Sequence, residues 1–170
     1  MTHSPKVVII GIGNEYRHDD AAGLIVARLI KEKTPDSCEV HEQTGEGTAL
    51  MQLWKDAPGL VIVIDAVQSG SPSGTIHYFD ANRHPVPSAT FRDSTHAFGL
   101  IEAIALSRTL AELPSHLVVY GIEGENFEAG TGLSAGVLNG VDKLVEQIRQ
   151  EIDVRCHGQL SIARQHNLPG

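Results

Sequence analysis

The feature that most constrains the fold is a short apolar run near the start of the chain, which ends in two closely spaced glycines. The run covers Val7–Ile10 and continues into Gly11–Asn14, which reads Gly-Ile-Gly-Asn. An unbroken run of β-branched residues is typical of a parallel strand buried on both faces, and the glycines indicate a tight turn at its carboxyl end. A helical pattern follows from Leu24. Because ligands bind beyond the strand ends in open α/β sheets, we expect one wall of a binding site at this loop.

Strand and helix patterns alternate along the rest of the chain. Strands are expected at residues 6–10, 38–42, 60–64, 75–79 and 117–122, and helices at residues 20–34, 49–54, 97–113 and 134–152. The link between residues 64 and 75 is too short for a crossover helix, so the strand at 75–79 should be an antiparallel edge strand. Right-handed crossovers place the first strand between the second and the third. The predicted fold is an α/β three-layer sandwich, with a mostly parallel sheet of about five strands and helices on both faces.

Length and composition limit the domain organisation and the classes of partner. A chain of 170 residues suits one domain, expected at residues 1–152, with a loose tail at 153–170. The net charge of -8 argues against a nucleic-acid partner. The longest apolar run is too short to span a membrane, and no signal pattern precedes it. Cys38 and Cys156 have neither metal-binding nor redox spacing, so we expect reduced thiols and a cytoplasmic setting.

Three residues on the expected carboxyl-end loops form a candidate metal site. Asp20 lies at the start of the first helix, Asp65 ends the third strand, and His96 precedes the helix at 97–113. Two carboxylates and an imidazole suit a divalent ion such as Zn²⁺ or Ni²⁺ with an open coordination position. Structural roles are the alternative: Asp19 or Asp20 can cap the helix, Asp65 can bond a neighbouring loop, and His96 can belong to a helix start.

Other site chemistries receive less support from the sequence. No serine lies in a nucleophile elbow, and neither cysteine falls in a candidate site loop. A dinucleotide fingerprint would need a third glycine where Tyr16 stands, although the loop can still approach a ligand through its backbone. The loop Glu123–Glu128 borders the same rim. It can hold a substrate tail or be a solvated acidic loop, and we expect the solvated loop.

The ordered set of motifs strongly resembles the nickel-iron hydrogenase maturation proteases, over roughly Lys6 to Glu151. The matching segments, in order, are Gly11–Asn14, Asp19-Asp20 with Gly23, Ile64–Val67, His96–Leu100, Gly121–Glu123 and Gly130–Ser134.

The resemblance implies an endopeptidase that removes the C-terminal extension of a hydrogenase large-subunit precursor once nickel is inserted. It implies that Asp20, Asp65 and His96 recognise that nickel, which the substrate carries; zinc or cadmium can occupy such a site in vitro. A monomer is implied, and no catalytic residue is assigned. We expect the substrate to contact the first loop and the second, glycine-rich loop at Gly11, Gly13, Asn14 and Gly45.

The second loop departs from the family pattern of an acid followed by Gly-Gly-Thr. Residues 43–48 read Gln-Thr-Gly-Glu-Gly-Thr, which indicates a subgroup that serves a different hydrogenase. Two other functions stay open from the sequence. One is a nickel-sensing or chaperone module that binds the precursor without cutting it, and the other is a nucleotide-binding α/β domain that uses the glycine loop.

Overall fold

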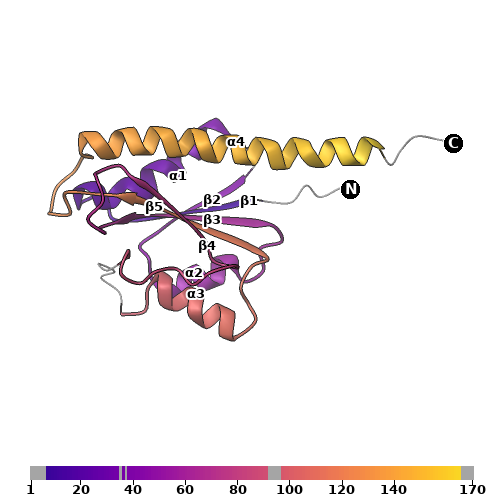
Figure 1. The fold of residues 1–170 in the computed structure, drawn as a ribbon, viewed down its shortest axis with the longest axis horizontal. Helices are drawn as coiled ribbons and strands as arrows, with labels where there is room; N and C mark the ends of the chain where they lie inside the picture. Colours follow the sequence, from indigo (N-terminus) through magenta and orange to yellow (C-terminus); the bar gives the residue numbers. More distant parts are fainter. Residues whose placement is uncertain (1–6, 35, 37, 92–96, 166–170) are drawn as a thin grey trace.

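The computed structural model describes residues 7–34, 36, 38–91 and 97–165, with the backbone alone over 156–165. Its centre is a five-stranded sheet with helices above and below (Figure 1). The strand order is β2-β1-β3-β5-β4, and β4 alone runs antiparallel, paired with β5 at the edge. The predicted three-layer fold, the position of the first strand between the second and the third, and the antiparallel edge strand are therefore confirmed. The strands are β1 (Val7–Ile12), β2 (Cys38–Gln43), β3 (Leu60–Val67), β4 (Ile76–Asp80) and β5 (His116–Glu123).

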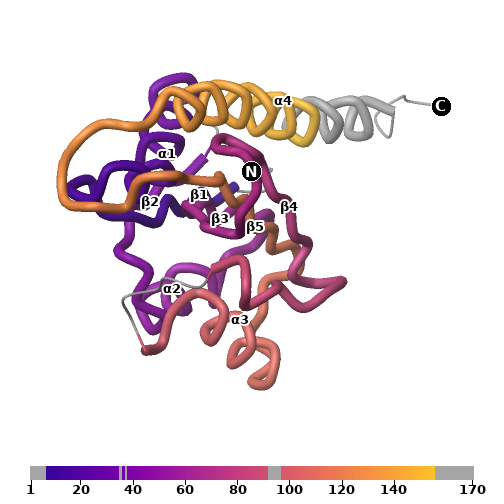
Figure 2. Tube along the Cα trace, turned by 60° about the vertical axis from the view of Figure 1, so that its left-hand side comes forward, coloured from indigo at the N-terminus to yellow at the C-terminus, as the bar shows by residue number. Residues whose placement is uncertain are grey.

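The helices form two layers, one on each face of the sheet. The pair α1 and α4 covers one face, and α2 with α3 covers the other (Figures 1 and 2). A 3-10 turn, η1, links β1 to α1. None of the helices in the described ranges is long and apolar enough to cross a membrane. The bounds are η1 (His18–Ala21), α1 (Ala22–Lys33), α2 (Gly47–Trp54), α3 (Leu100–Thr109) and α4 (Ala135–Gln165).

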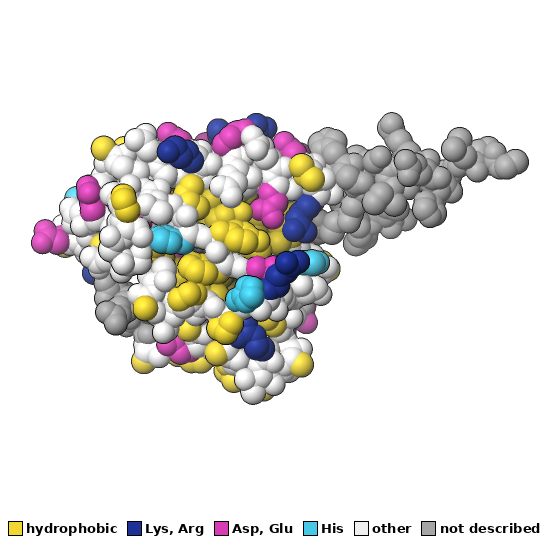
Figure 3. Space-filling model, viewed as in Figure 1, with side chains coloured by type: hydrophobic (Ala, Val, Ile, Leu, Met, Phe, Trp, Pro, Cys, Tyr) yellow, Lys and Arg dark blue, Asp and Glu magenta, His cyan; other side chains and the backbone are white. Residues whose placement is uncertain are grey.

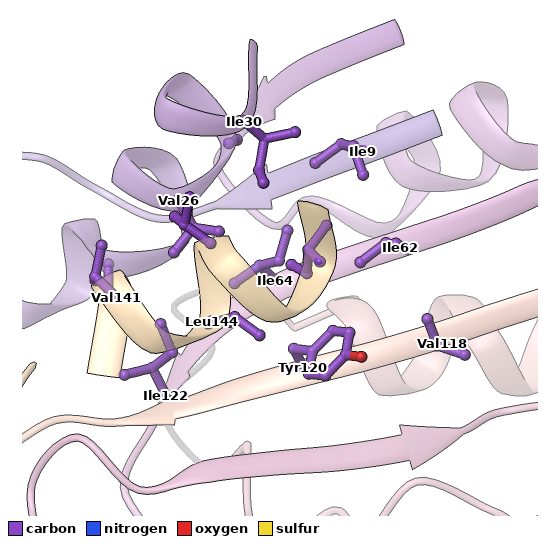
Figure 4. Packing of buried hydrophobic residues seen from close by; sticks show 14 of the residues in the cluster. Ile9, Val26, Ile30, Ile62, Ile64, Val118, Tyr120, Ile122, Val141 and Leu144 are labelled. Carbon is purple, nitrogen blue, oxygen red and sulfur yellow. The ribbon is translucent and has the colours of Figure 1, made fainter. Parts of the chain in front are cut away.

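Alternate residues of the central strands supply two separate cores. Ile9 and Ile62 point toward α1 and α4, where they join Val26, Val141 and Leu144 (Figure 4). The intervening strand residues, such as Ile10 and Val63, pack against Leu50, Trp54 and Ile104 from the opposite helices. Because both faces are covered, these strands need apolar residues at every position, which explains the unbroken runs in the sequence.

Several expected element bounds differ from the structure. β3 continues past Asp65 to Val67, because it stays paired with β5 as far as Glu123. Helix α3 begins at Leu100 rather than at 97, where the carboxylate of Glu102 accepts a hydrogen bond from the Gly99 N–H.

Helix α4 does not end near Asp153, as the sequence pattern predicts, but continues to Gln165. Its apolar stripe stops at Ile152, so periodicity gave no sign of the remaining turns. Ion pairs between residues four apart bridge this point, Arg149 with Asp153 and Arg155 with Glu151, and they favour continued helix.

The edge strand β4 lies open on the face shown in Figures 1 and 3. Apolar side chains gather around this edge between α4 and the α2–α3 layer (Figure 3). Tyr78 of β4 is 52% exposed, and its ring tilts against that of buried Tyr120 at a centroid distance of 5.3 Å. This edge runs along the side of the sheet, whereas the cavities described below lie at the strand ends.

Candidate functional site

A cavity of about 400 Å³ opens at the carboxyl end of the sheet. The ends of β1 and β3 form its floor, and the loops after β2, after β4 and after β5 form its walls, together with the first turn of α3. This is the position at which the first and third strands diverge, as expected for a ligand site in an open α/β sheet. Its lining residues are Ile12, Arg17, Asp20, Thr44, Gly45, Asp65–Gln68, Ser88–Phe91, Leu100–Glu102 and Phe127.

The predicted acids Asp20 and Asp65 both line this cavity. Burial raises the pKa of Asp65 to about 8, and the nearby charge of Asp20 adds to the rise. Burial also raises the pKa of Asp20, although the positive charge of Arg17 and a hydrogen bond from the Asn14 backbone oppose it. The structure therefore brings two carboxyl groups from different strand ends close enough for the charge of Asp20 to affect the ionisation of Asp65.

The third predicted metal ligand, His96, lies outside the described residues. Within the described ranges, no cluster of three His, Cys, Asp or Glu side chains is placed to hold a metal ion. Donor chemistry alone makes Asp20 and Asp65 suitable for a divalent cation, since two carboxylates supply oxygen ligands and leave coordination positions free.

Asp19 has a different role from its neighbour. It is fully buried, and its carboxylate accepts hydrogen bonds from the Glu125 and Asn126 N–H groups and from the N–H and hydroxyl of Ser134. Neither Asp19 nor Asp20 makes a side-chain cap bond at η1 or α1, so the predicted capping role is wrong. Asp19 instead fixes the loop after β5 against the turn that carries Asp20.

The predicted contact residues Gly11 and Gly13 allow close packing of the helix and turn. A Cβ atom on Gly11 would lie 2.4 Å from the carbonyl oxygen of Gly23, because α1 crosses β1 directly at this point. A Cβ atom on Gly13 would lie 2.0 Å from the carbonyl oxygen of Asp20. Gly11 is buried within β1 and lines neither of the two cavities described here. These two glycines therefore set the height of Asp20 above the sheet.

A second, more open cavity of about 520 Å³ adjoins the first. It contains Gly13 and Asn14, whereas Gly45, with a positive φ of 98°, lines the first cavity. The two cavities share three lining residues, which are Arg17, Asp20 and Thr44. Three of the four predicted contact residues thus line a cavity next to Asp20.

The loop after β5 is only partly the solvated acidic loop that the sequence predicts. Glu125 and Glu128 are exposed, but Glu123 is 1% exposed and accepts hydrogen bonds from the Ser69 N–H, the Ser69 hydroxyl and the Gly70 N–H. The His77 ring also bonds this carboxylate. Glu123 therefore holds the chain that leaves β3, directly after the cavity residues Ala66–Gln68.

Two residues of the site were not found by sequence reasoning. The sequence does not distinguish Asp19 from Asp20, and it assigns no role to Arg17. An adjacent pair of acids does not show which one reaches the site, because the partners that bury Asp19 lie more than a hundred residues away in the sequence. Arg17 carries one local signal, since it is a basic residue two positions before the acid pair in the loop that follows the first strand.

Solved structures with this α/β fold include hydrogenase maturation endopeptidases and proteases. The HybD hydrogenase maturating endopeptidase from Escherichia coli superposes with a TM-score of 0.72 at 24% identity, covering 84% of this chain and 89% of that one. The [NiFe] hydrogenase maturation protease HycI from Thermococcus kodakarensis gives a TM-score of 0.65 at 26% identity, covering 88% and 93%.

Sequence comparison gives the family. The model described as HycI, hydrogenase maturation protease, matches residues 23–151, so the chain belongs to the hydrogenase maturation protease family. Hydrogenase 2 maturation protease of Escherichia coli K12 is 26% identical over 148 residues, covering 84% of this chain and 88% of that protein. The hydrogenase expression/formation protein HupD of Thiocapsa roseopersicina is 29% identical over 125 residues, covering 72% of this chain. The match spans only 56% of HupD's length.

Proposed function

We propose that this protein is an endopeptidase that removes a C-terminal extension from the large-subunit precursor of a nickel-iron hydrogenase, after nickel has been inserted. The observation that carries the proposal is the meeting of Asp20 and Asp65 in one cavity at the sheet's carboxyl end, in a chain of this family. These two acids are the ones that both the strand topology and the family resemblance select.

In this proposal the nickel ion belongs to the substrate. Asp20 and Asp65 supply carboxylate oxygens to open positions on the precursor's nickel, and His96 supplies a nitrogen. Binding the ion places the adjoining peptide bond against the cavity wall. A precursor without nickel lacks this contact, so coordination acts as a check that metal insertion is complete.

The surroundings of the two acids support recognition of a cation. Apart from Arg17, the ionisable side chains in the described lining of the first cavity are all acidic, and they are Asp20, Asp65 and Glu102. Such a lining attracts a metal-bearing segment and repels phosphate groups. It therefore favours the peptidase over the nucleotide-binding alternative.

The test is a cleavage assay with purified precursor, with and without nickel, read by mass spectrometry of the large subunit. We expect the wild-type protein to shorten only the nickel-loaded precursor, and Asp20→Asn and Asp65→Asn to abolish the reaction. Asp142→Asn, at an exposed position on α4, is the matched control. Binding of the loaded precursor without shortening would instead establish the non-catalytic nickel-sensing module.

A further inference from the structure

Arg17 lies where the two cavities meet, and no function has yet been assigned to it. It lines both cavities, together with Asp20 and Thr44. An extended peptide that occupies both cavities must therefore pass beside Arg17. Resting on the proposed function, we propose that the Arg17 guanidinium binds the carbonyl oxygen of the scissile peptide bond and stabilises the negative charge that develops there.

The Arg17 backbone is held on two sides. Its N–H donates to the Asn14 carbonyl at 3.2 Å, and its carbonyl accepts from the Asp20 N–H at 3.1 Å. Arg17 also forms a β-bridge with Gly130 in the loop after β5. The position of this residue relative to Asp20 is consequently fixed before any substrate binds, as electrostatic catalysis requires.

The side chain is anchored in a way that leaves hydrogen-bond donors available. Arg17 Nε donates to the Phe127 carbonyl at 3.2 Å, and this bond does not use the two Nη groups. Among the described residues, no carboxylate forms an ion pair with Arg17, although Asp20 lines both cavities beside it. The planar group can therefore present paired N–H donors to an incoming oxygen atom.

Arg28, the other arginine of the second cavity, shows the contrast. Its guanidinium bonds Glu42 at 2.9 Å and Glu15 at 3.3 Å, so its donors are already committed to carboxylates. Of these two arginines, only Arg17 also reaches the cavity that contains Asp65. The available positive group thus lies beside the proposed nickel-recognition acids.

Charge selects a carbonyl oxygen rather than a carboxylate as the group that Arg17 binds. Asp20 and Glu102 share the first cavity with it and would repel a substrate carboxylate. A neutral peptide carbonyl meets no such repulsion. When water adds to the carbonyl carbon, negative charge moves onto this oxygen, where a cationic donor has its largest effect. The C–N bond then breaks, and the proton from water passes to the departing amine.

Kinetics of precursor cleavage with Arg17→Ala and Arg17→Lys test the assignment. We expect Arg17→Ala to lower kcat by about 100-fold or more, with KM changed by less than about threefold, because the contact strengthens only in the transition state. Arg17→Lys keeps the charge without the planar donor pair, so it should fall between Arg17→Ala and the wild-type protein. Arg83→Ala, at a surface arginine paired with Asp80, is the control and should retain wild-type kinetics.

Chemical rescue separates this role from a structural one. Added guanidinium ion should partly restore cleavage by Arg17→Ala and leave Arg83→Ala unchanged, while affinity for the loaded precursor stays at the wild-type level. A wild-type kcat, or a higher KM with unchanged kcat, would overturn the Arg17 assignment while leaving the peptidase intact. Failure of the wild-type protein to cleave loaded precursor would refute the proposed function and this inference together. If Arg17→Ala does not fold, the kcat and KM of Arg17→Lys decide whether Arg17 acts in the transition state.

Discussion

Asp19 and Ser134 lie 115 positions apart in the sequence and are joined by two hydrogen bonds. The Ser134 N–H donates to Asp19 Oδ1 at 2.7 Å, and the Ser134 hydroxyl donates to Oδ2 at 2.8 Å. Oδ2 also accepts the Glu125 and Asn126 N–H groups, each at 2.9 Å. One buried carboxylate thus closes the loop between β5 and α4 onto the turn that places Asp20 in the site.

Asp19→Ala should destabilise the protein far more than a surface change does. It leaves three partly buried backbone N–H groups without their acceptor, and we expect a loss of about 3 kcal/mol in the free energy of unfolding. Urea unfolding measures this loss. Ser134→Ala removes only the hydroxyl bond and should cost about 1 kcal/mol. Equal, small effects of the two substitutions would contradict the closing role of Asp19.

Glu123 should make the free energy of unfolding depend on pH in the acidic range. Burial alone would raise its pKa, but hydrogen bonds from Ser69, His77 and Gly70 outweigh burial and lower the pKa below the ordinary value of 4.5. A carboxyl whose pKa is depressed on folding contributes stability above its unfolded pKa and loses it as the pH falls through the folded value. Glu123→Gln should therefore be less stable than the wild-type protein at neutral pH, and the difference should shrink below pH 4.5.

The measurement is the free energy of unfolding of both proteins across this pH range. Glu128→Gln, at an exposed position of the same loop, serves as the control and should follow the wild-type curve. A gap between Glu123→Gln and the wild-type protein that stays constant into acid would show that Glu123 acts through packing rather than through its charge.

Gly11→Ala should disturb the contact between β1 and α1. The added methyl group would lie 2.4 Å from the Gly23 carbonyl oxygen and 2.7 Å from the Ala27 Cβ, so the helix must move away from the strand. Overpacking of this kind costs about 1–3 kcal/mol, and because α1 follows the turn that holds Asp20, cleavage should fall as well. Thermal unfolding with a parallel precursor assay checks both effects. Glu32→Ala, on the exposed side of α1, should change neither.

The sequence predicted the fold well because the information was local or followed from general rules. Apolar runs located the central strands, and the length of the link before Thr75 identified the antiparallel edge strand. The right-handed crossover connections then place Asp20 and Asp65 at the same edge of the sheet, where the parallel strands end. The end of α4 was missed because its last turns have no apolar stripe to reveal them.

The parts of the site that the sequence did not predict depend on contacts between distant segments. Asp19 and Asp20 are chemically identical neighbours, and only the loop after β5 determines which one is enclosed. Glu123 looked like the start of a solvated acidic loop, but residues 69–77 fold over it and bury its carboxylate. The position of Arg17 depends on a hydrogen bond to the Phe127 carbonyl and on two cavities formed by distant segments. Residue spacing in the sequence indicates neither of them.

His96 provides the sharpest remaining test of nickel recognition, because its assignment comes from the resemblance and the sequence order. His96→Ala should lower cleavage of nickel-loaded precursor by more than about 100-fold, since even groups that only orient a metal ligand change activity by about 10–100-fold. The free energy of unfolding should change little. His84→Ala, at an exposed histidine in the loop after β4, is the matched control. Full processing by His96→Ala would show that the imidazole is not part of the recognition site and that the two carboxylates recognise nickel without it.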